Sequence, residues 1–206
     1  MAEYMTDKEQ IQQIKEWWND HGKWLAVAVA IGLVLGFGWR YWQMYKHQRS
    51  EKAATLYQTM LNAEALNKKG VATQYIKQLQ AHYSHSPYTA LAVFNAAKDD
   101  VANKKYQDAL SKYIWVEGHN STSSFRQIAR IRAARVLIAM KKYDEAMQQL
   151  AVTTNKYFEP MIENVRGDIF EAQGNNDAAL KAYRKAKEGY SRINVANPIM
   201  DIKLVS

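Results

Sequence analysis

Few side chains in this sequence are placed to carry out chemistry together. His82 and His85 lie three residues apart, and on one turn of a helix both imidazoles could bind a metal ion. The pair precedes Pro87, where a helix is expected to end, and no third ligand lies near it in the sequence. We therefore predict a histidine pair in a loop or cap, with a metal site as the alternative.

Two pairs of neighbouring acids, Asp99–Asp100 and Asp144–Glu145, suggest acid–base catalysis only at first sight. Adjacent residues of a helix point in different directions, so solvated helix faces account for both pairs. The patterns G-x-x-x-x-G-K-[ST], G-x-S-x-G and H-E-x-x-H do not occur in the sequence, and neither does cysteine. These observations predict a protein that is not an enzyme and has no cofactor, no metal and no small-molecule substrate.

Four arginines fall within ten residues: Arg126, Arg130, Arg132 and Arg135. At helical spacing, Arg126 and Arg130 share one face, whereas Arg132 and Arg135 share another. A nucleic-acid-binding helix needs a contiguous basic stripe. The divided arginines therefore predict no nucleic-acid partner, and we expect them to face acids or a protein partner.

The composition indicates that helices position these residues. The 206 residues include 28 Lys and Arg against 20 Asp and Glu, a net charge of +8, and 48% of them are hydrophobic. Such values are typical of a folded protein and exclude a disordered or collagen-like chain. With 9 Gly and 3 Pro, the chain has few turn formers for an all-β fold. The length allows one domain and an additional segment.

That segment is an apolar stretch near the N-terminus. Lys23 and Arg40 enclose 16 uncharged residues, and counting to Trp42 gives 19 positions, or ~28 Å of helix, which suits a hydrocarbon core of ~30 Å. No small residues follow it for signal-peptide cleavage, and no face of it is polar, as a core helix of a soluble domain would require. The sequence therefore predicts an amphipathic segment at 1–23, a transmembrane helix at 24–42 and a helical domain at 43–206.

Gly32 and Gly36 form a G-x-x-x-G pair within this stretch. Such a pair lets a second membrane helix approach closely, so both glycines are predicted contact residues. The alternative is that they are passive, because glycine is common in membrane helices. Three positive residues precede the stretch and four follow it closely, a difference that favours a cytoplasmic C-terminal domain by one charge and leaves the topology open.

The rest of the chain repeats itself. Three segments superimpose, KKYQDAL at 104–110, KKYDEAM at 141–147 and GNNDAAL at 174–180, with periods of 37 and 33 residues that bracket the ~34 of a tetratricopeptide repeat. Each repeat has two small residues twelve positions apart, where paired helices are expected to cross closely, and a bulky residue four positions later. The small pairs are Ala97 with Ala109, Ala134 with Ala146, and Gly167 with Ala179; the bulky residues are Tyr113, Leu150 and Tyr183.

A weaker repeat precedes these three. Ala63 and Leu79 occupy its first small position and its bulky position, whereas Tyr75 stands where a small residue is expected. This hairpin should therefore be distorted. After the last repeat, Asn197 and Pro198 are expected to start a short helix that caps the stack. The residues expected to seal the last hairpin are Ile199, Ile202 and Leu204.

The predicted fold class is thus all-α: an N-terminal single transmembrane helix followed by a tetratricopeptide-repeat-like α-solenoid of helical hairpins. In such a stack each hairpin buries the apolar face that its neighbour exposes. An irregular helical bundle is the alternative.

Several sequence motifs occur together in one known family. They are GWRYW at 38–42, RAARV at 132–136, VRGD at 165–168 and IKLVS at the end of the chain. On these the chain resembles, over its whole length, the YfgM-like family of ancillary SecYEG translocon subunits of Gram-negative bacteria. It departs from that family in being clearly basic.

The resemblance implies a single-pass protein of the bacterial inner membrane, with 1–23 cytoplasmic, 24–42 in the lipid bilayer and 43–206 periplasmic. It also implies a non-enzymatic scaffold that binds the SecYEG translocon and a PpiD-like periplasmic chaperone, passes new chains to periplasmic chaperones and restrains the Rcs stress-response regulator. The alternative function is a cytoplasm-facing tetratricopeptide adaptor or assembly factor for an envelope complex. An anchored hydrolase lacks a candidate nucleophile.

In tetratricopeptide stacks, extended segments bind the concave face, which the first helix of each hairpin lines. The predicted partner-binding residues are Leu91, Phe94, Lys98, Arg135, Asn164 and Asp168. The same count also places Val101, Ile128, Ile131, Ile138, Met161 and Glu171 on that face. Alternatively, the apolar residues of this set belong to the core, and Arg135 forms an ion pair with Asp168 between neighbouring hairpins.

Overall fold

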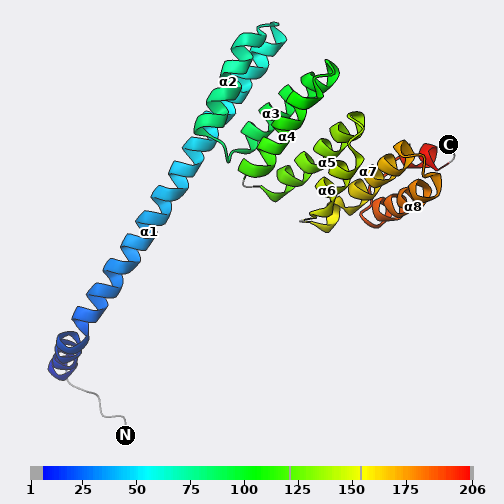
Figure 1. Cartoon of the computed structure of the whole chain (residues 1–206). Helices are drawn as coiled ribbons and strands as arrows, with labels where there is room; N and C mark the ends of the chain where they lie inside the picture. The colour runs from blue at the N-terminus through cyan, green and yellow to red at the C-terminus, as the bar shows by residue number, and fades with distance from the viewer. Residues whose placement is uncertain (1–6, 121, 154, 205–206) are drawn as a thin grey trace. The chain divides into compact units, whose positions relative to one another are not determined.

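The computed structural model describes residues 7–120, 122–153 and 155–204, and the side chains of these except 7–10, 13 and 14 (Figure 1). The start of the predicted amphipathic segment and the last two residues of IKLVS lie outside the described residues. Within them the chain is helical and has no strand. The helices are α1 (Asp7–Ala65), α2 (Lys69–His82), α3 (Pro87–Ala102), α4 (Tyr106–His119), α5 (Ser123–Ala139), α6 (Tyr143–Ala151), the short 3₁₀ helix η1 (Lys156–Phe158), α7 (Glu159–Ala172), α8 (Asn176–Arg192) and α9 (Ile199–Lys203).

The chain divides into two units, 1–51 and 52–206. In the first unit, α1 carries the apolar stretch and is long and apolar enough to cross a membrane by length and composition. The side chains from 24 to 42 are exposed, so the stretch is not the buried core helix of a soluble domain. Near its end, the Lys46 ammonium lies 3.6 Å above the Trp42 ring, a cation–π contact.

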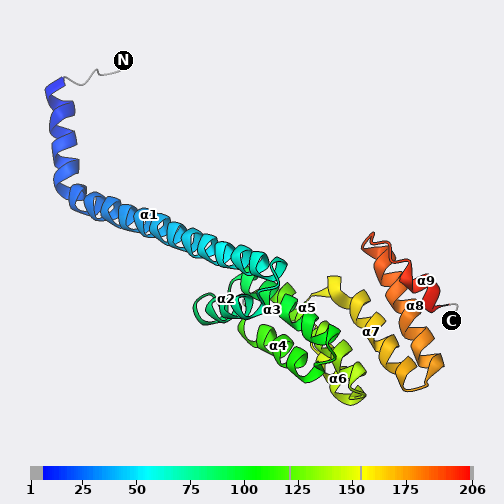
Figure 2. The ribbon, with the colours of Figure 1, turned by 90° about the horizontal axis from the view of Figure 1, so that it is seen from above.

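In the second unit, α3–α4, α5–α6 and α7–α8 follow one another as hairpins of closely packed helices (Figure 1 and Figure 2). The turn of each of these hairpins contains one residue with positive φ, and so does the turn between α1 and α2 that precedes them. These residues are Asn67 (57°), Lys104 (59°), Lys141 (60°) and Gly174 (78°). These residues recur at intervals of 37, 37 and 33, so the predicted repeat is confirmed and has a weaker first member. The shared KKY phrase marks the turn between the two helices of a hairpin.

The small residues lie where the helices of a hairpin cross. Ala97, Ala109, Ala134 and Ala146 are fully buried, and Ala179 is 3% exposed. At Gly167 a Cβ atom would overlap the ring of Tyr183. The bulky positions fill the space beside these crossings: Tyr113, Leu150 and Tyr183 are all buried. Because a larger side chain at a crossing would force the helices apart, the spacing of small residues sets the packing of each hairpin.

The two ends of the stack differ from the regular hairpins. In the first hairpin Ala63 and Leu79 are buried as predicted, and Tyr75 is half-buried. At the other end, α9 packs on α8 through Met200, which is 1% exposed against Ala186 and Tyr190. The prediction that Ile199 and Ile202 seal the last hairpin is wrong, since these residues are 57% and 69% exposed. The register of this short helix turns Met200 inward instead.

Candidate partner-binding groove

A groove of about 460 Å³ opens in the second unit between α1, α3, α4 and α5. Leu91, Phe94, Lys98 and Arg135, four of the six predicted partner-binding residues, line it. The first two lie on one turn of α3, while Arg135 comes from the first helix of the next hairpin. The repeat count therefore brought together residues of two hairpins that are 37 positions apart.

The floor of the groove is apolar. Phe94 is 5% exposed, and its ring centroid lies 6.0 Å from that of Tyr113 and 6.1 Å from that of Phe125. Leu91 is 37% exposed and offers apolar surface to a bound molecule. Burial raises the pKa of the Tyr113 hydroxyl, and the nearby cation of Arg132 partly opposes that rise. Phe94 thus belongs both to the hydrophobic core and to the lining of the groove.

Three cationic side chains line the groove beside this apolar floor. The Arg132 guanidinium lies 4.6 Å from the centroid of the Phe94 ring, and Lys98 and Arg135 are exposed beside it. None of the three forms an ion pair with another described side chain, and no acid is among the groove-lining residues. The groove therefore combines apolar surface with three cations that form no ion pair, and the carboxylate of Glu64 lies at its edge, hydrogen-bonded to the groove-lining Asn95.

The other two arginines of the run have structural partners. Arg130 Nε donates to Glu117 Oε1 at 2.9 Å, linking α5 to α4. Arg126 Nη1 donates to the backbone oxygen of Asn120 at 2.9 Å. The division of the run into two faces is thus visible: one face holds the helices together, and the other faces the groove. Arg132 was not among the predicted site residues, although its spacing from Arg135 placed both on one face.

The charged groove positions belong to a row that continues along the stack. Glu64, Lys98, Arg135 and Asp168 each directly follow the first small residue of their hairpin. Glu64 Oε2 accepts a hydrogen bond of 2.5 Å from the Asn95 side chain. Burial, and then the charge of Asp99, raise the pKa of Glu64, while the hydrogen bond from Asn95 lowers it.

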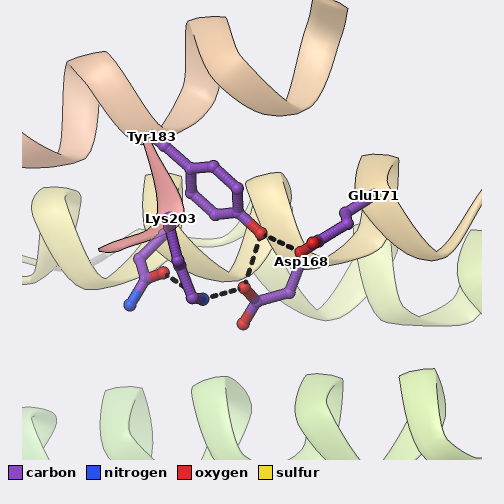
Figure 3. Close-up of polar contacts among 5 residues, drawn as sticks. Asp168, Glu171, Tyr183 and Lys203 are labelled. Atoms are coloured by element: carbon purple, nitrogen blue, oxygen red, sulfur yellow. Dashed lines mark hydrogen bonds and ion pairs between the residues drawn. The ribbon is translucent and has the colours of Figure 1, made fainter. Parts of the chain in front are cut away.

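At the far end of the row, Asp168 belongs to a polar cluster between α7, α8 and α9 (Figure 3). Lys203 Nζ donates to Asn164 Oδ1 at 2.9 Å and forms an ion pair with Asp168. The Tyr183 hydroxyl lies 3.0 Å from Asp168 Oδ1 and 2.6 Å from Glu171 Oε2. The alternative in which Arg135 pairs with Asp168 is therefore wrong: Lys203 of α9 takes that place.

The tyrosine at the centre of this cluster, Tyr183, has a strongly raised pKa. Burial raises the pKa of Tyr183 most, and its hydrogen bonds with Glu171 and Asp168 and their negative charges raise it further. Lys203 Nζ also lies 4.8 Å from the centroid of the Tyr183 ring. Asn164 and Asp168 thus contact the chain's own last helix. The sequence offered no sign of Lys203 in this role, because the contact joins residues 35 positions apart without a repeat to relate them.

The apolar positions predicted on the concave face differ in burial. Val101 lines the groove and Ile131 is 3% exposed. Three others are half-buried and pack against the core: Ile128, Ile138 and Met161.

At Gly32 and Gly36 a Cβ would meet nothing within 4 Å in the described chain, so this face of α1 is open. Their contact with a partner helix stays a prediction.

The residue pairs that suggested chemistry make contacts within the hairpins. His85 Nδ1 lies 2.6 Å from the backbone oxygen of His119, at the end of α4. Asp100 pairs with Lys112 at 2.5 Å across the α3–α4 hairpin, and Glu145 pairs with Lys142 at 2.9 Å. Among the described residues, no group of three or more His, Asp or Glu side chains is placed to hold a metal ion.

Residues 15–206 match a family model described as a tetratricopeptide repeat-like domain. Several relatives carry the name ancillary SecYEG translocon subunit. The protein of Aggregatibacter actinomycetemcomitans is 28% identical over 91% of this chain and 92% of its own length. That of Neisseria gonorrhoeae is 27% identical over 100% and 99%. That of Haemophilus influenzae is 28% identical over 53% of each chain, so the chain matches about half the length of this relative.

Proposed function

Because this chain belongs to the YfgM-like family of tetratricopeptide repeat-like proteins, we propose that it is a non-enzymatic, membrane-anchored subunit that accompanies the SecYEG translocon. The observation that carries the proposal is the groove of the second unit, with its apolar floor at Leu91 and Phe94 and its unpaired cations. Such a surface suits the binding of a polypeptide segment. The names of relatives that match nearly the whole chain support the translocon as the place of action.

The proposal includes the finer part of the resemblance. In it, a PpiD-like periplasmic chaperone is a second partner, and the protein links translocation to periplasmic chaperones and restrains the Rcs regulator. The chain would lie in the bacterial inner membrane through residues 24–42, with 1–23 in the cytoplasm and 43–206 in the periplasm. The apolar part of α1 supports the anchor, and the family resemblance supports the orientation.

A reporter fused after Ser206 tests the orientation. Alkaline phosphatase, which is active only in the periplasm, should be active at this position, and a fluorescent protein that matures only in the cytoplasm should be dark. The opposite pair of results would contradict the proposal and support the cytoplasm-facing adaptor, which the charge count around the anchor favours by one residue.

Photo-crosslinking from the groove tests the partner-binding role. In cells producing the full chain, a photoreactive amino acid at Leu91 should crosslink to a translocon subunit or a membrane-anchored chaperone, identified by mass spectrometry. The same amino acid at Lys77, which is exposed on α2 and outside the groove, serves as the matched control. Equal crosslinking from both positions would show that the groove has no special role.

A further inference from the structure

In the row of charges along the stack, the two acids at the ends have partners within the chain, whereas the two cations in the middle form no ion pair with another described side chain. Glu64 accepts a hydrogen bond from Asn95, and Asp168 is paired with Lys203. Between them, Lys98 and Arg135 occupy the equivalent positions of α3 and α5 and form no ion pair with another described side chain. The protein therefore satisfies its two acids internally and leaves its two cations open to a partner.

We propose that the groove binds an extended, acidic segment of a partner polypeptide. Carboxylates of that segment pair with Lys98 and Arg135, and an apolar side chain between them covers Leu91 and Phe94. The inference rests on the proposed function, in which the groove is the partner-binding surface, and it adds the chemistry of the partner.

The last hairpin gives an internal precedent for this recognition. There the position equivalent to Lys98 and Arg135 is Asp168, and a side chain of opposite charge, that of Lys203, reaches it from α9 (Figure 3). The same lysine also donates a hydrogen bond to the side-chain oxygen of Asn164, at the position equivalent to Phe94. One position of this row thus already binds an oppositely charged side chain of the chain itself, with the sign reversed.

The spacing of the cations suits an extended chain. Neighbouring packed helices lie ~10 Å apart, and an extended chain rises ~3.3 Å per residue. Carboxylates four residues apart are therefore separated by ~13 Å, and the long side chains of Lys98 on α3 and Arg135 on α5 can reach both of them. Arg132 adds a planar guanidinium that is held over Phe94 and can bind a carboxylate with two N–H groups. Alternate side chains of an extended segment point to the same face, so two acids four residues apart place the apolar residue midway between them on the floor.

The apolar floor of the groove favours a polypeptide over an anionic lipid surface as the bound partner. A lipid headgroup layer would neutralise Lys98 and Arg135 but would leave the apolar surface of Leu91 uncovered. A polypeptide segment covers both kinds of surface at once. We therefore assign the groove to a polypeptide and treat the lipid surface as an outcome of the test.

The test measures peptide binding to the full chain in detergent by fluorescence anisotropy. The probe is a labelled peptide in which glutamate and leucine alternate at every second position with serine between them, so that an extended chain presents both to one face, and its control has glutamine in place of each glutamate. We expect the acidic peptide to bind about tenfold more tightly and to lose this advantage at high salt. Equal affinity for the two peptides would overturn the inference, as would displacement of the probe by phosphatidylglycerol added to the detergent micelles as efficiently as by unlabelled acidic peptide.

A pair of variants assigns the effect to the groove. The double variant Lys98→Glu with Arg135→Glu should abolish the preference for the acidic peptide. The matched variant Lys77→Glu with Lys181→Glu changes the same charge on exposed residues outside the groove and should keep the preference. If the reversed variant fails to fold by circular dichroism, Lys98→Gln with Arg135→Gln should still weaken acidic binding about threefold. An unchanged preference in a folded variant would overturn the inference.

Co-purification of the unmodified chain with the SecYEG translocon separates this inference from the proposed function. If the translocon co-purifies and the two peptides bind equally, the acidic preference fails alone. If the acidic peptide is preferred and the translocon is absent from the purified material, the proposed place of action fails and the groove chemistry stands.

Discussion

The aromatic ring of Tyr183 packs directly on the backbone of Gly167, where α7 and α8 cross. The equivalent crossings of the two preceding hairpins hold alanine instead, Ala97 and Ala134. Because Gly167 has no Cβ, α7 and α8 approach more closely at this point than alanine would permit. The Tyr183 hydroxyl is then able to reach Asp168 and Glu171 on the same face of α7.

We expect Gly167→Ala to destabilise the second unit by about 1–3 kcal/mol, because the added methyl group overlaps a ring that its hydrogen bonds hold in place. Thermal unfolding of the purified chain, followed by circular dichroism, measures the change. Gly118→Ala is the control, since a Cβ there would meet nothing within 4 Å. A melting temperature that is equal in the two variants would contradict the close crossing.

We expect the stability of the second unit to fall as the pH rises above ~10, the ordinary pKa of tyrosine. The folded state raises the pKa of Tyr183, so above that pH the unfolded chain loses a proton that the folded chain retains, which favours unfolding. Tyr183→Phe should make this alkaline loss smaller, although Tyr57 and Tyr113 also have raised pKa values. Denaturant unfolding between pH 8 and ~11 measures it, and Tyr157→Phe, at a 69% exposed residue, is the control.

We expect Lys104→Gly to stabilise the chain by about 0.5–1 kcal/mol. Lys104 has φ of 59°, a conformation that costs a residue with a Cβ ~1–2 kcal/mol, while glycine gives back part of this through its freedom in the unfolded state. Its neighbour Lys105 has φ of −82°, so Lys105→Gly should destabilise instead. Chemical denaturation of both variants compares the two signs, and equal signs would contradict the turn geometry.

We expect Gly32→Leu with Gly36→Leu to weaken co-purification with the translocon or with a membrane-anchored chaperone. Leucine keeps the helix apolar, so insertion should survive, while the flat surface for a close helix contact is lost. The melting temperature of the second unit should not change, because these residues belong to the first unit. Unchanged co-purification would leave the glycines as lipid-facing residues without a partner.

The sequence predicted the regular part of the fold through a short-range pattern. The small residues at the helix crossings recur at fixed intervals because every hairpin meets the same packing constraint. That count also led to Lys98 and Arg135, which lie in different hairpins and line one groove. In a repeat protein, equivalent positions of successive hairpins lie close together, so the spacing of residues in a single sequence predicts which of them are neighbours in the fold.

The tail could not be predicted in this way, because nothing in it repeats. Its apolar residues do not show by spacing which of them faces α8, and the register of α9 turns Met200 inward and leaves Ile199 and Ile202 exposed. The ion pair of Lys203 with Asp168 depends on the path of the chain between α8 and α9. A contact of this kind follows from the three-dimensional packing of two segments, and no residue pattern in the sequence of either segment predicts it.

The place of Met200 has a consequence for how such an array can lengthen in evolution. By covering Ala186 and Tyr190, Met200 occupies the surface of α8 on which the first helix of another hairpin would stack. A gene duplication that appended a hairpin after α8 would have to displace this helix, whereas one that inserted a hairpin between two existing ones would find both neighbours already complementary.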